Sequence, residues 1–389
     1  MFENGRFWCA VLALAAVNLV VPSAHWRTRA LAALAVSFVV LYAVVGLTPV
    51  GLLMVVGAAV WVGLGVWWMR RGVARRLQPG VVVLLLIVPL LAFWVLGKEA
   101  AAFGWQRTGI LYVTGWSYFI VKAWTLIKDV HDERVRNPDP VIAVSFFLFF
   151  PTYVAGPMHL YSEFDRSLRE GHAPDGETIV DAAFRFVLGL VKVRVLAPLL
   201  APLSLAGMND MPGVGPGAII AGSLVYSVVL WADFSGYTDL AISTSRLVGI
   251  NAPENFQRPF LATNIREFWQ RWHISFTRVL TSYVFVPISR RLQRTNRWTR
   301  TQVVIAAYGM TFLLVGFWHG PTANFALWGM YHGAGLVAYD VYHQYRAGWS
   351  QRFRVGARLP GASVLGRALS MGGTFMFVSL GWILFVRGV

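Results

Sequence analysis

Long apolar stretches recur along the whole chain, and no other feature constrains its fold as much. A helix needs about 20 consecutive apolar residues to cross a bilayer. Such stretches cover residues 7–22, 30–47, 50–69, 81–97, 109–127, 141–157, 184–206, 218–243, 303–318, 322–343 and 368–386. Only 13% of the residues are charged, against about 25% in soluble domains. The sequence therefore predicts an all-α polytopic membrane protein with about eleven helical elements.

Basic residues are grouped between the apolar stretches, and they predict how the chain is oriented. The net charge is +16, with 34 Lys and Arg against 18 Asp and Glu. Basic blocks occupy residues 27–29, 70–76, 290–300 and 346–367, as expected of cytoplasmic loops, which carry an excess of Lys and Arg. We therefore expect the N-terminus outside, no nucleic-acid partner, and an uncleaved first helix rather than a signal peptide.

The segment 258–289 interrupts this pattern. Three clear apolar stretches separate the basic loop at 128–136 from the block at 290–300, whereas two loops on one side need an even number of crossings. Either residues 258–289 supply a fourth crossing, or one of the three stretches does not cross. The segment is unusually polar. Irregular backbone at membrane depth persists only where protein or water covers it.

Two acidic residues lie inside the otherwise apolar stretch 218–243. A charged side chain there costs about 2.5–3.5 kcal/mol, so Asp233 and Asp239 are functional candidates. Ser235 and Gly236 between them are small enough for another helix to approach closely. Two explanations are open: the aspartates line a polar cavity, or they pair with arginines such as Arg271 and hold helices together.

A histidine accompanies aromatic residues in the run "NIREFWQRWHISFTR". Trp269, Trp272, His273 and Phe276 have the spacing of one helical face. Glu267 and Arg271 are four residues apart and can pair on such a helix. A lone histidine on an aromatic face is usually part of the core, so His273 gains a functional interpretation only together with other motifs.

Two further histidines lie in the oily run "GFWHGPTANFALWGMYHG". Because proline lacks a backbone donor and glycine is permissive, the Gly-Pro after His319 predicts a break between two helices. His332 lies on the second helix, followed by Gly333 and Gly335, which allow another backbone or a ligand to come close. A desolvated, unpaired imidazole tends to stay neutral, and a neutral ring can take a proton from a hydroxyl.

Signatures of other chemistries are missing. The sequence has no HExxH zinc motif and no GxSxG nucleophile elbow, which leaves Ser235 little support as a nucleophile. With one cysteine it has no multi-cysteine cluster. We expect no metal site.

Three runs together resemble one family. Residues 231–280 followed by 316–333, and the run "FFPTYVAGPMHLYSEF" at 149–164, are similar to the membrane-bound O-acyltransferase (MBOAT) family. The resemblance points to its bacterial branch of alginate O-acetyltransferases and the D-alanyl transfer protein of teichoic acid synthesis, and it is strongest from about residue 149 to 345. It implies that His319 is the active-site histidine of the WHG motif and that His273 is the second active-site residue. It also implies a ring of tilted helices around a central funnel, with residues 258–289 as the floor of the site.

The resemblance implies an acyltransferase without a bound cofactor. It would move an acyl group, with acetyl expected, from a cytoplasmic thioester of coenzyme A or a carrier protein to a hydroxyl of an extracytoplasmic polysaccharide or cell-wall polymer. His319 would be the general base. We expect a multi-pass protein of the bacterial inner (cytoplasmic) membrane, whose partners are the lipid bilayer, the donor and an extracytoplasmic partner acyltransferase.

The sequence also predicts how the site and the chain are organised. We expect one integral-membrane domain, with peripheral helices at 1–140, the catalytic core at 141–345, and a basic loop and C-terminal helix at 346–389. The expected substrate-binding residues are Asp233, Ser235, Tyr237, Asp239, Asn264, Trp269, Arg271, Trp318 and His332. Two alternatives stay open. One is a transporter or channel in which intramembrane Asp and His residues form a relay, although no paired halves are detectable. The other is a scaffold in which both histidines are dispensable.

Overall fold

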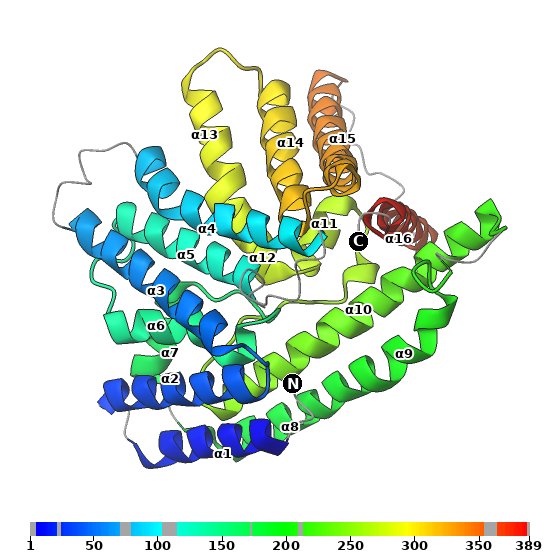
Figure 1. Cartoon of the computed structure of the whole chain (residues 1–389). Coiled ribbons are helices and arrows are strands. Elements are labelled where there is room, and N and C mark those ends of the chain that lie inside the picture. Colours follow the sequence, from blue (N-terminus) through cyan, green and yellow to red (C-terminus); the bar gives the residue numbers. More distant parts are fainter. Residues whose placement is uncertain are drawn as a thin grey trace. The chain divides into compact units, whose positions relative to one another are not determined.

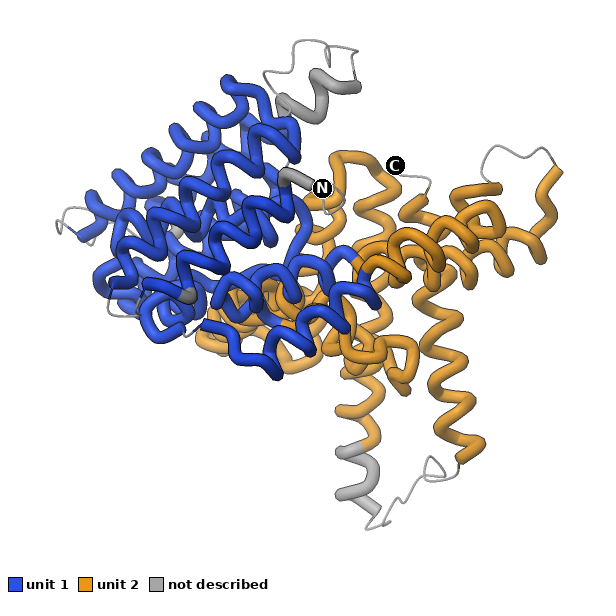
Figure 2. The backbone as a smooth tube through the Cα atoms, turned by 90° about the horizontal axis from the view of Figure 1, so that it is seen from below, with its two compact units in different colours: residues 1–189, 237–253 blue, residues 190–236, 254–389 orange. Residues whose placement is uncertain are grey.

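The chain folds into helices that group into two compact units. The computed structural model describes residues 5–21, 25–70, 79–102, 115–171, 173–208, 213–353 and 364–386, and these ranges contain helices without a β-strand. One unit comprises Met1–Gly189 and Tyr237–Pro253, and the other Leu190–Gly236 and Glu254–Val389 (Figure 2). We call them unit 1 and unit 2. Helix α10 (Pro216–Leu247) begins in unit 2 and ends in unit 1.

Six helices in the described ranges are long and apolar enough to cross a membrane. They are Trp26–Ala43, Pro49–Arg70, Gly176–Leu203, Pro216–Leu247, Arg300–His319 and Val364–Val386. The prediction of an all-α polytopic membrane protein is confirmed. The expected ring and funnel stay a prediction, as does the functional division at residues 140 and 345.

The predicted span at 141–157 is wrong. Helix α6 (Pro140–Leu148) ends after nine residues, and a 3₁₀ turn (Phe150–Thr152) follows it. Pro151 in that turn has no backbone N–H to donate to a carbonyl four residues earlier, so an α-helix does not continue through it. Nine helical residues span about 14 Å, less than half of the hydrocarbon core. For the predicted span at 109–127, residues 109–114 lie outside the described ranges.

Unit 1 is built around a core of phenylalanines. Its helices are α1 (Gly5–Val20), α2 (Trp26–Ala43), α3 (Pro49–Arg70), α4 (Pro79–Ala102), α5 (Trp116–His131), α6, α7 (Tyr161–Glu170), most of α8 (Gly176–Val191) and the end of α10. Helices α1 and α2 lie side by side (Figure 1). Phe146, Phe149 and Phe150 are fully buried, and Phe149 meets Phe164 of α7 with ring centroids 5.3 Å apart.

A buried arginine joins distant parts of unit 1. The side chain of Arg29 on α2 donates to Asn18 Oδ1 at 2.5 Å and to the carbonyl oxygen of Gly171. Asn18 in turn donates to the carbonyl of Val248 at 2.7 Å. A buried cation is tolerated only when hydrogen bonds satisfy it. These bonds therefore hold the chain after α10 within unit 1.

Unit 2 carries both histidines that the resemblance singled out. Its helices are α9 (Ala197–Leu200), the start of α10, α11 (Ile265–Arg271), α12 (Ile274–Leu280), α13 (Val286–Arg294), α14 (Arg300–His319), α15 (Ala323–Phe353) and α16 (Val364–Val386). A π-helical segment, Thr281–Phe285, connects α12 to α13. Helices α13, α14 and α15 lie next to one another (Figure 1). Helix α15 continues past its predicted end at residue 343.

Glycines let α14 and α15 pack closely. A Cβ atom on Gly316 would clash with the carbonyl of Phe325, and one on Gly329 would clash with the carbonyl of Phe312. Gly333 also lies against Phe312, so the glycine after His332 serves this helix contact. Close backbone approach of this kind is typical of helix pairs in membranes. It fixes the hairpin that carries His319 at its turn.

The polar segment 258–289 is broken into short helices. The expected single helical face of Trp269, Trp272, His273 and Phe276 is wrong, because α11 ends at Arg271 and α12 begins at Ile274. Between them His273 has a left-handed backbone with φ of 46°. A side chain that leaves the helical path in this way cannot share one face with residues of the preceding helix.

Backbone pairing with an upstream loop explains this break. The N–H of Gln257 donates to the carbonyl of Arg271 at 2.9 Å, and the N–H of Ile274 donates to the carbonyl of Asn255 at 2.9 Å. Phe256 and Trp272 form an isolated antiparallel bridge. These groups bond across to the loop rather than along a helix. The tertiary contact thus overrides the helical spacing of the sequence.

Candidate active site

His319 lies at the break between α14 and α15, as predicted. It is the last residue of α14, and Gly320 after it is extended, with φ of 177°. The ring is half-buried. Its centroid lies 5.1 Å from that of Trp328 and 5.0 Å from that of Phe385 on α16. The imidazole of His319 therefore has apolar neighbours, and part of the residue stays accessible.

His273 lies at the other break and is 6% exposed. Its ring meets Phe234 of α10 at 4.8 Å and Phe276 at 5.0 Å between centroids. Its Nδ1 lies 3.0 Å from Oδ1 of Asn255. Its Nε2 is buried and has no hydrogen-bond partner in the part of the chain that the structure describes.

A row of ring contacts connects the two histidines. Phe276 meets Trp318 at 4.6 Å, and Trp318 meets His319 at 4.8 Å between centroids. His273 lies outside the six candidate membrane spans. Burial, with a smaller electrostatic contribution from the neighbouring His319, lowers the pKa of His273 to about 3. The ring of His273 is therefore neutral at physiological pH.

His332 is fully buried among aromatic rings of unit 2. Its centroid lies 5.0 Å from Trp328, 5.3 Å from Trp269 and 5.4 Å from Tyr331. Within the described ranges neither ring nitrogen has a hydrogen-bond partner. A Cβ atom on Gly381 of α16 would lie 2.8 Å from its Nε2. This enclosure is that of a core histidine, and its predicted contact with substrate stays a prediction.

Trp269 lines a cavity of about 330 Å³ within unit 2. The walls combine apolar and polar side chains from α11, α12, the π-helical segment, α14 and α15: Arg266, Trp269, Gln270, Thr277, Leu280, Thr281, Phe285, Tyr308, Thr311, Phe312, Leu336 and Asp340. Arg266 and Asp340 of this lining form an ion pair. Trp269 also meets Trp328, which faces His319. Two indole rings therefore lie between this cavity and the candidate base.

Asn264 and Arg271 have structural partners on α11. The Asn264 side chain caps the helix by accepting a hydrogen bond from the N–H of Glu267 at 2.9 Å. Arg271 pairs with Glu267 at 2.5 Å, which confirms the predicted pair. Arg271 is thus not the arginine that pairs with Asp239. The partner of Asp239 is Arg185 on α8, at 2.9 Å. The role of Asn264 and Arg271 in substrate binding stays a prediction.

The remaining candidates on α10 fall in different units. Asp233 is exposed, and Ser235 is buried, both in unit 2. Within the described ranges Ser235 Oγ has no hydrogen-bond partner. Tyr237 and Asp239 belong to unit 1. Of the predicted site residues and their neighbours in unit 2, Phe234 contacts His273 and Trp318 contacts His319.

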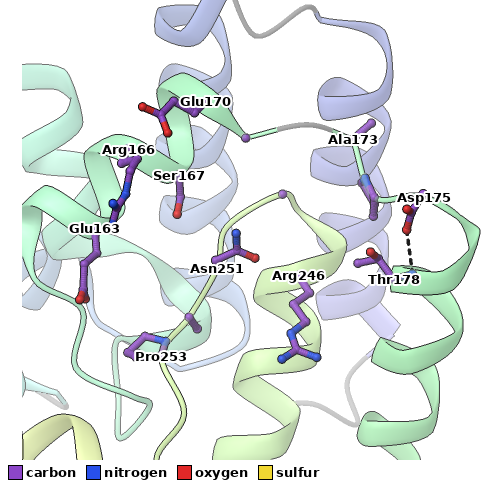
Figure 3. A pocket seen from close by; sticks show the side chains of 14 residues that line it. Glu163, Arg166, Ser167, Glu170, Ala173, Asp175, Thr178, Arg246, Asn251 and Pro253 are labelled. Carbon is purple, nitrogen blue, oxygen red and sulfur yellow. Dashed lines mark hydrogen bonds between the residues drawn. The ribbon is translucent and has the colours of Figure 1, made fainter.

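A larger cavity lies in unit 1 and contains none of the predicted site residues. Its volume is about 690 Å³. It opens between the end of α7, the start of α8 and the end of α10 (Figure 3). Glu163, Glu170 and Asp175 line it together with Arg166 and Arg246. The lining thus carries three acidic and two basic side chains.

Sequence reasoning missed three contacts of the histidines. Asn255 bonds to His273, while Trp328 and Phe385 enclose His319. Asn255 lies in a loop and Phe385 on the last helix, so no local spacing connects either of them to a histidine. Trp328 lies in the run that contains His332. This run has several aromatic residues, so being aromatic did not distinguish Trp328 as a neighbour of His319.

Comparison with known proteins identifies the family of the chain. The model of the membrane-bound O-acyltransferase family, MBOAT, matches residues 37–380. The teichoic acid D-alanyltransferase of Bacillus subtilis is 26% identical over 70% of this chain and 68% of its own length. The probable alginate O-acetylase AlgI of Azotobacter vinelandii is 29% identical over 84% of this chain and 63% of its own. The peptidoglycan O-acetyltransferase of Helicobacter pylori is 31% identical over 65% of this chain and 48% of its own length.

The matches to these three relatives span from about half to two thirds of their length. The family match, in contrast, covers most of this chain, including both helix breaks and the WHG motif at His319. A multi-pass helical chain with this match from α2 to α16 belongs to the membrane-bound O-acyltransferase family.

Proposed function

We propose that this protein transfers an acyl group, acetyl by preference, from a thioester donor to a hydroxyl of an extracytoplasmic polysaccharide or cell-wall polymer. Coenzyme A or a carrier protein would present the donor at the cytoplasmic face of a bacterial inner membrane. The observation that carries the proposal is the pair of histidines at two helix breaks, connected by the ring contacts of Phe276 and Trp318. The names of the relatives, which act on alginate, peptidoglycan and teichoic acid, support the acceptor class.

His319 is the general base in this mechanism. Its neutral ring takes the proton of the acceptor hydroxyl while the oxygen attacks the thioester carbonyl carbon. The tetrahedral intermediate then collapses, the C–S bond breaks, and the imidazolium returns the proton to the leaving thiolate. General base catalysis of this kind contributes about 10²- to 10⁴-fold. His273 either orients the acceptor or stabilises the oxyanion.

The basic end of unit 2 supports a cytoplasmic donor with anionic groups. Arg290, Arg291 and Arg294 are exposed on α13. A patch of this kind raises the local concentration of phosphates or of an acidic carrier protein. The cavity beside Arg266, lined up to Phe285 just before α13, supplies an amphipathic wall. An extracytoplasmic partner acyltransferase would complete the pathway to the polymer.

The decisive test is His319→Ala in the purified full chain, assayed with labelled acetyl coenzyme A and surface polymer from a strain that lacks this protein. We expect transfer to fall about 10²- to 10⁴-fold, because only the base is lost. His343→Ala is the matched control, since His343 is exposed on α15, and it should keep wild-type transfer. Undiminished transfer by His319→Ala would remove His319 from the mechanism. Solute flux in liposomes without any acyl donor would favour a transporter instead.

A further inference from the structure

Asn255 makes the most specific polar contact of the candidate active site. It is fully buried, and its side-chain Oδ1 lies 3.0 Å from His273 Nδ1, 2.8 Å from Ser275 Oγ and 3.2 Å from the backbone nitrogen of Ser275. Its backbone carbonyl accepts from the N–H of Ile274 at 2.9 Å. One residue from a distant loop thus fastens both the backbone and the ring at this break.

The contact with Ser275 identifies which atom of Asn255 faces the histidine. A backbone N–H can only donate a hydrogen bond. The atom of the Asn255 side chain that faces the N–H of Ser275 must be the carbonyl oxygen. The amide nitrogen of Asn255 is itself a donor and could not accept this hydrogen bond. Asn255 therefore presents an acceptor to His273 Nδ1.

The tautomer of His273 follows from this acceptor. An unprotonated Nδ1 would place its lone pair against the lone pairs of the oxygen at 3.0 Å, which is repulsive. Nδ1 thus carries the hydrogen. In a neutral imidazole the other nitrogen then has the free lone pair. That nitrogen, Nε2, is the one that has no hydrogen-bond partner in the described part of the chain.

We propose that Asn255 is a positioning residue that holds His273 in the Nδ1–H tautomer, so that Nε2 accepts a hydrogen bond from the polymer acceptor. This inference rests on the proposed function and decides between its two roles for His273. An Nε2 lone pair can hold a hydroxyl of the acceptor, whereas it has no hydrogen to donate to an oxyanion. Because His319 takes the proton of the reacting hydroxyl, His273 binds a second hydroxyl, which a polysaccharide supplies.

The first experiment observes the tautomer without any catalysis. The imidazole ¹⁵N signals of His273 distinguish a protonated Nδ1 from a protonated Nε2 in the labelled full chain, with His273→Gln used to assign them. We expect the Nδ1–H form in the wild type and in Ser275→Ala, which keeps the Asn255 contact, and a mixture of tautomers in Asn255→Ala. An Nε2–H form in the wild type, or no change in Asn255→Ala, would overturn the proposal even if the protein is an acyltransferase.

The second experiment separates orientation from oxyanion stabilisation. With labelled acetyl coenzyme A and the isolated surface polymer, Asn255→Ala should lower kcat/KM about 10- to 100-fold, mainly through a higher KM for the polymer, because a mixed tautomer orients the acceptor poorly. The KM for the donor should stay unchanged. A lower kcat with an unchanged polymer KM would overturn the orienting role. Absence of transfer by the wild type would contradict the proposed function, and the ¹⁵N signals alone would then decide the role of Asn255.

Asn255→Asp keeps the acceptor oxygen and adds a charge. It therefore tests whether Asn255 acts through its hydrogen bond to His273 and not only through the packing of the loop. The Nδ1–H form should persist, and transfer should be close to wild type above neutral pH. The new carboxylate favours the imidazolium and raises the pKa of His273 from its low value. Transfer should therefore fall on the acidic side at a higher pH than in the wild type. A pH profile identical to that of the wild type would contradict the contact between residue 255 and His273.

Discussion

His319 and His273 each stand where a helix ends, but different interactions hold the two breaks. At His319 the chain itself ends the helix, because Gly320 and Pro321 follow and α15 starts only at Ala323. At His273 the backbone pairs with residues 255–257 and leaves the helical path. The first break is local and robust, whereas the second depends on a loop from elsewhere in the chain. Substitutions far from the ring should therefore affect His273 more than His319.

The largest expected effect comes from removing the two histidines together. His319→Ala should lose about 10²- to 10⁴-fold in kcat, and His273→Ala less, because one takes the proton and the other orients the acceptor. Groups that act as a unit are not additive. The double variant should therefore be scarcely slower than His319→Ala alone, as measured by single-turnover transfer of labelled acetyl groups. Fully multiplicative losses would mean that the two rings act independently.

The hairpin at His319 can be weakened without touching either histidine. Gly329→Ala places a Cβ atom against the carbonyl of Phe312, which should destabilise the protein by about 1–3 kcal/mol. Gly309→Ala on α14 is the matched control, since nothing lies within 4 Å of its added Cβ atom. It should be neutral or stabilising by about 0.5–1 kcal/mol. Thermal unfolding in detergent measures both, and equal shifts would show that close packing of α14 and α15 is unimportant.

The smallest expected effect concerns the ion pair on α11, next to the break at His273. Arg271→Ala removes a partly exposed pair and should cost under about 1 kcal/mol. Glu267→Ala should cost more, about 1–2 kcal/mol, because this carboxylate also accepts from the N–H and hydroxyl of Thr263 at 2.7 and 2.8 Å. Unfolding in detergent ranks the two variants. A larger cost for Arg271→Ala would mean that its partner is not mainly Glu267.

Local features of the sequence predicted a large part of this molecule. Apolar length alone located most of the helices, and a Gly-Pro pair located the break at His319. The Glu267–Arg271 pair also followed from spacing, because residues four apart on a helix are neighbours. The arginine partner of Asp239 could not be predicted from spacing, because it is Arg185 on another helix. Side chains on different helices meet only through packing, which spacing along one helix does not describe.

The sequence by itself determined that the chain crosses a membrane as helices and that His319 ends one of them. These properties rest on burial of apolar side chains and on the backbone limits of glycine and proline, which act within a few residues. Only the tertiary structure decided the conformation and the tautomer of His273. Both depend on hydrogen bonds to Asn255, and such a bond forms only when folding brings a donor and an acceptor from separate segments together.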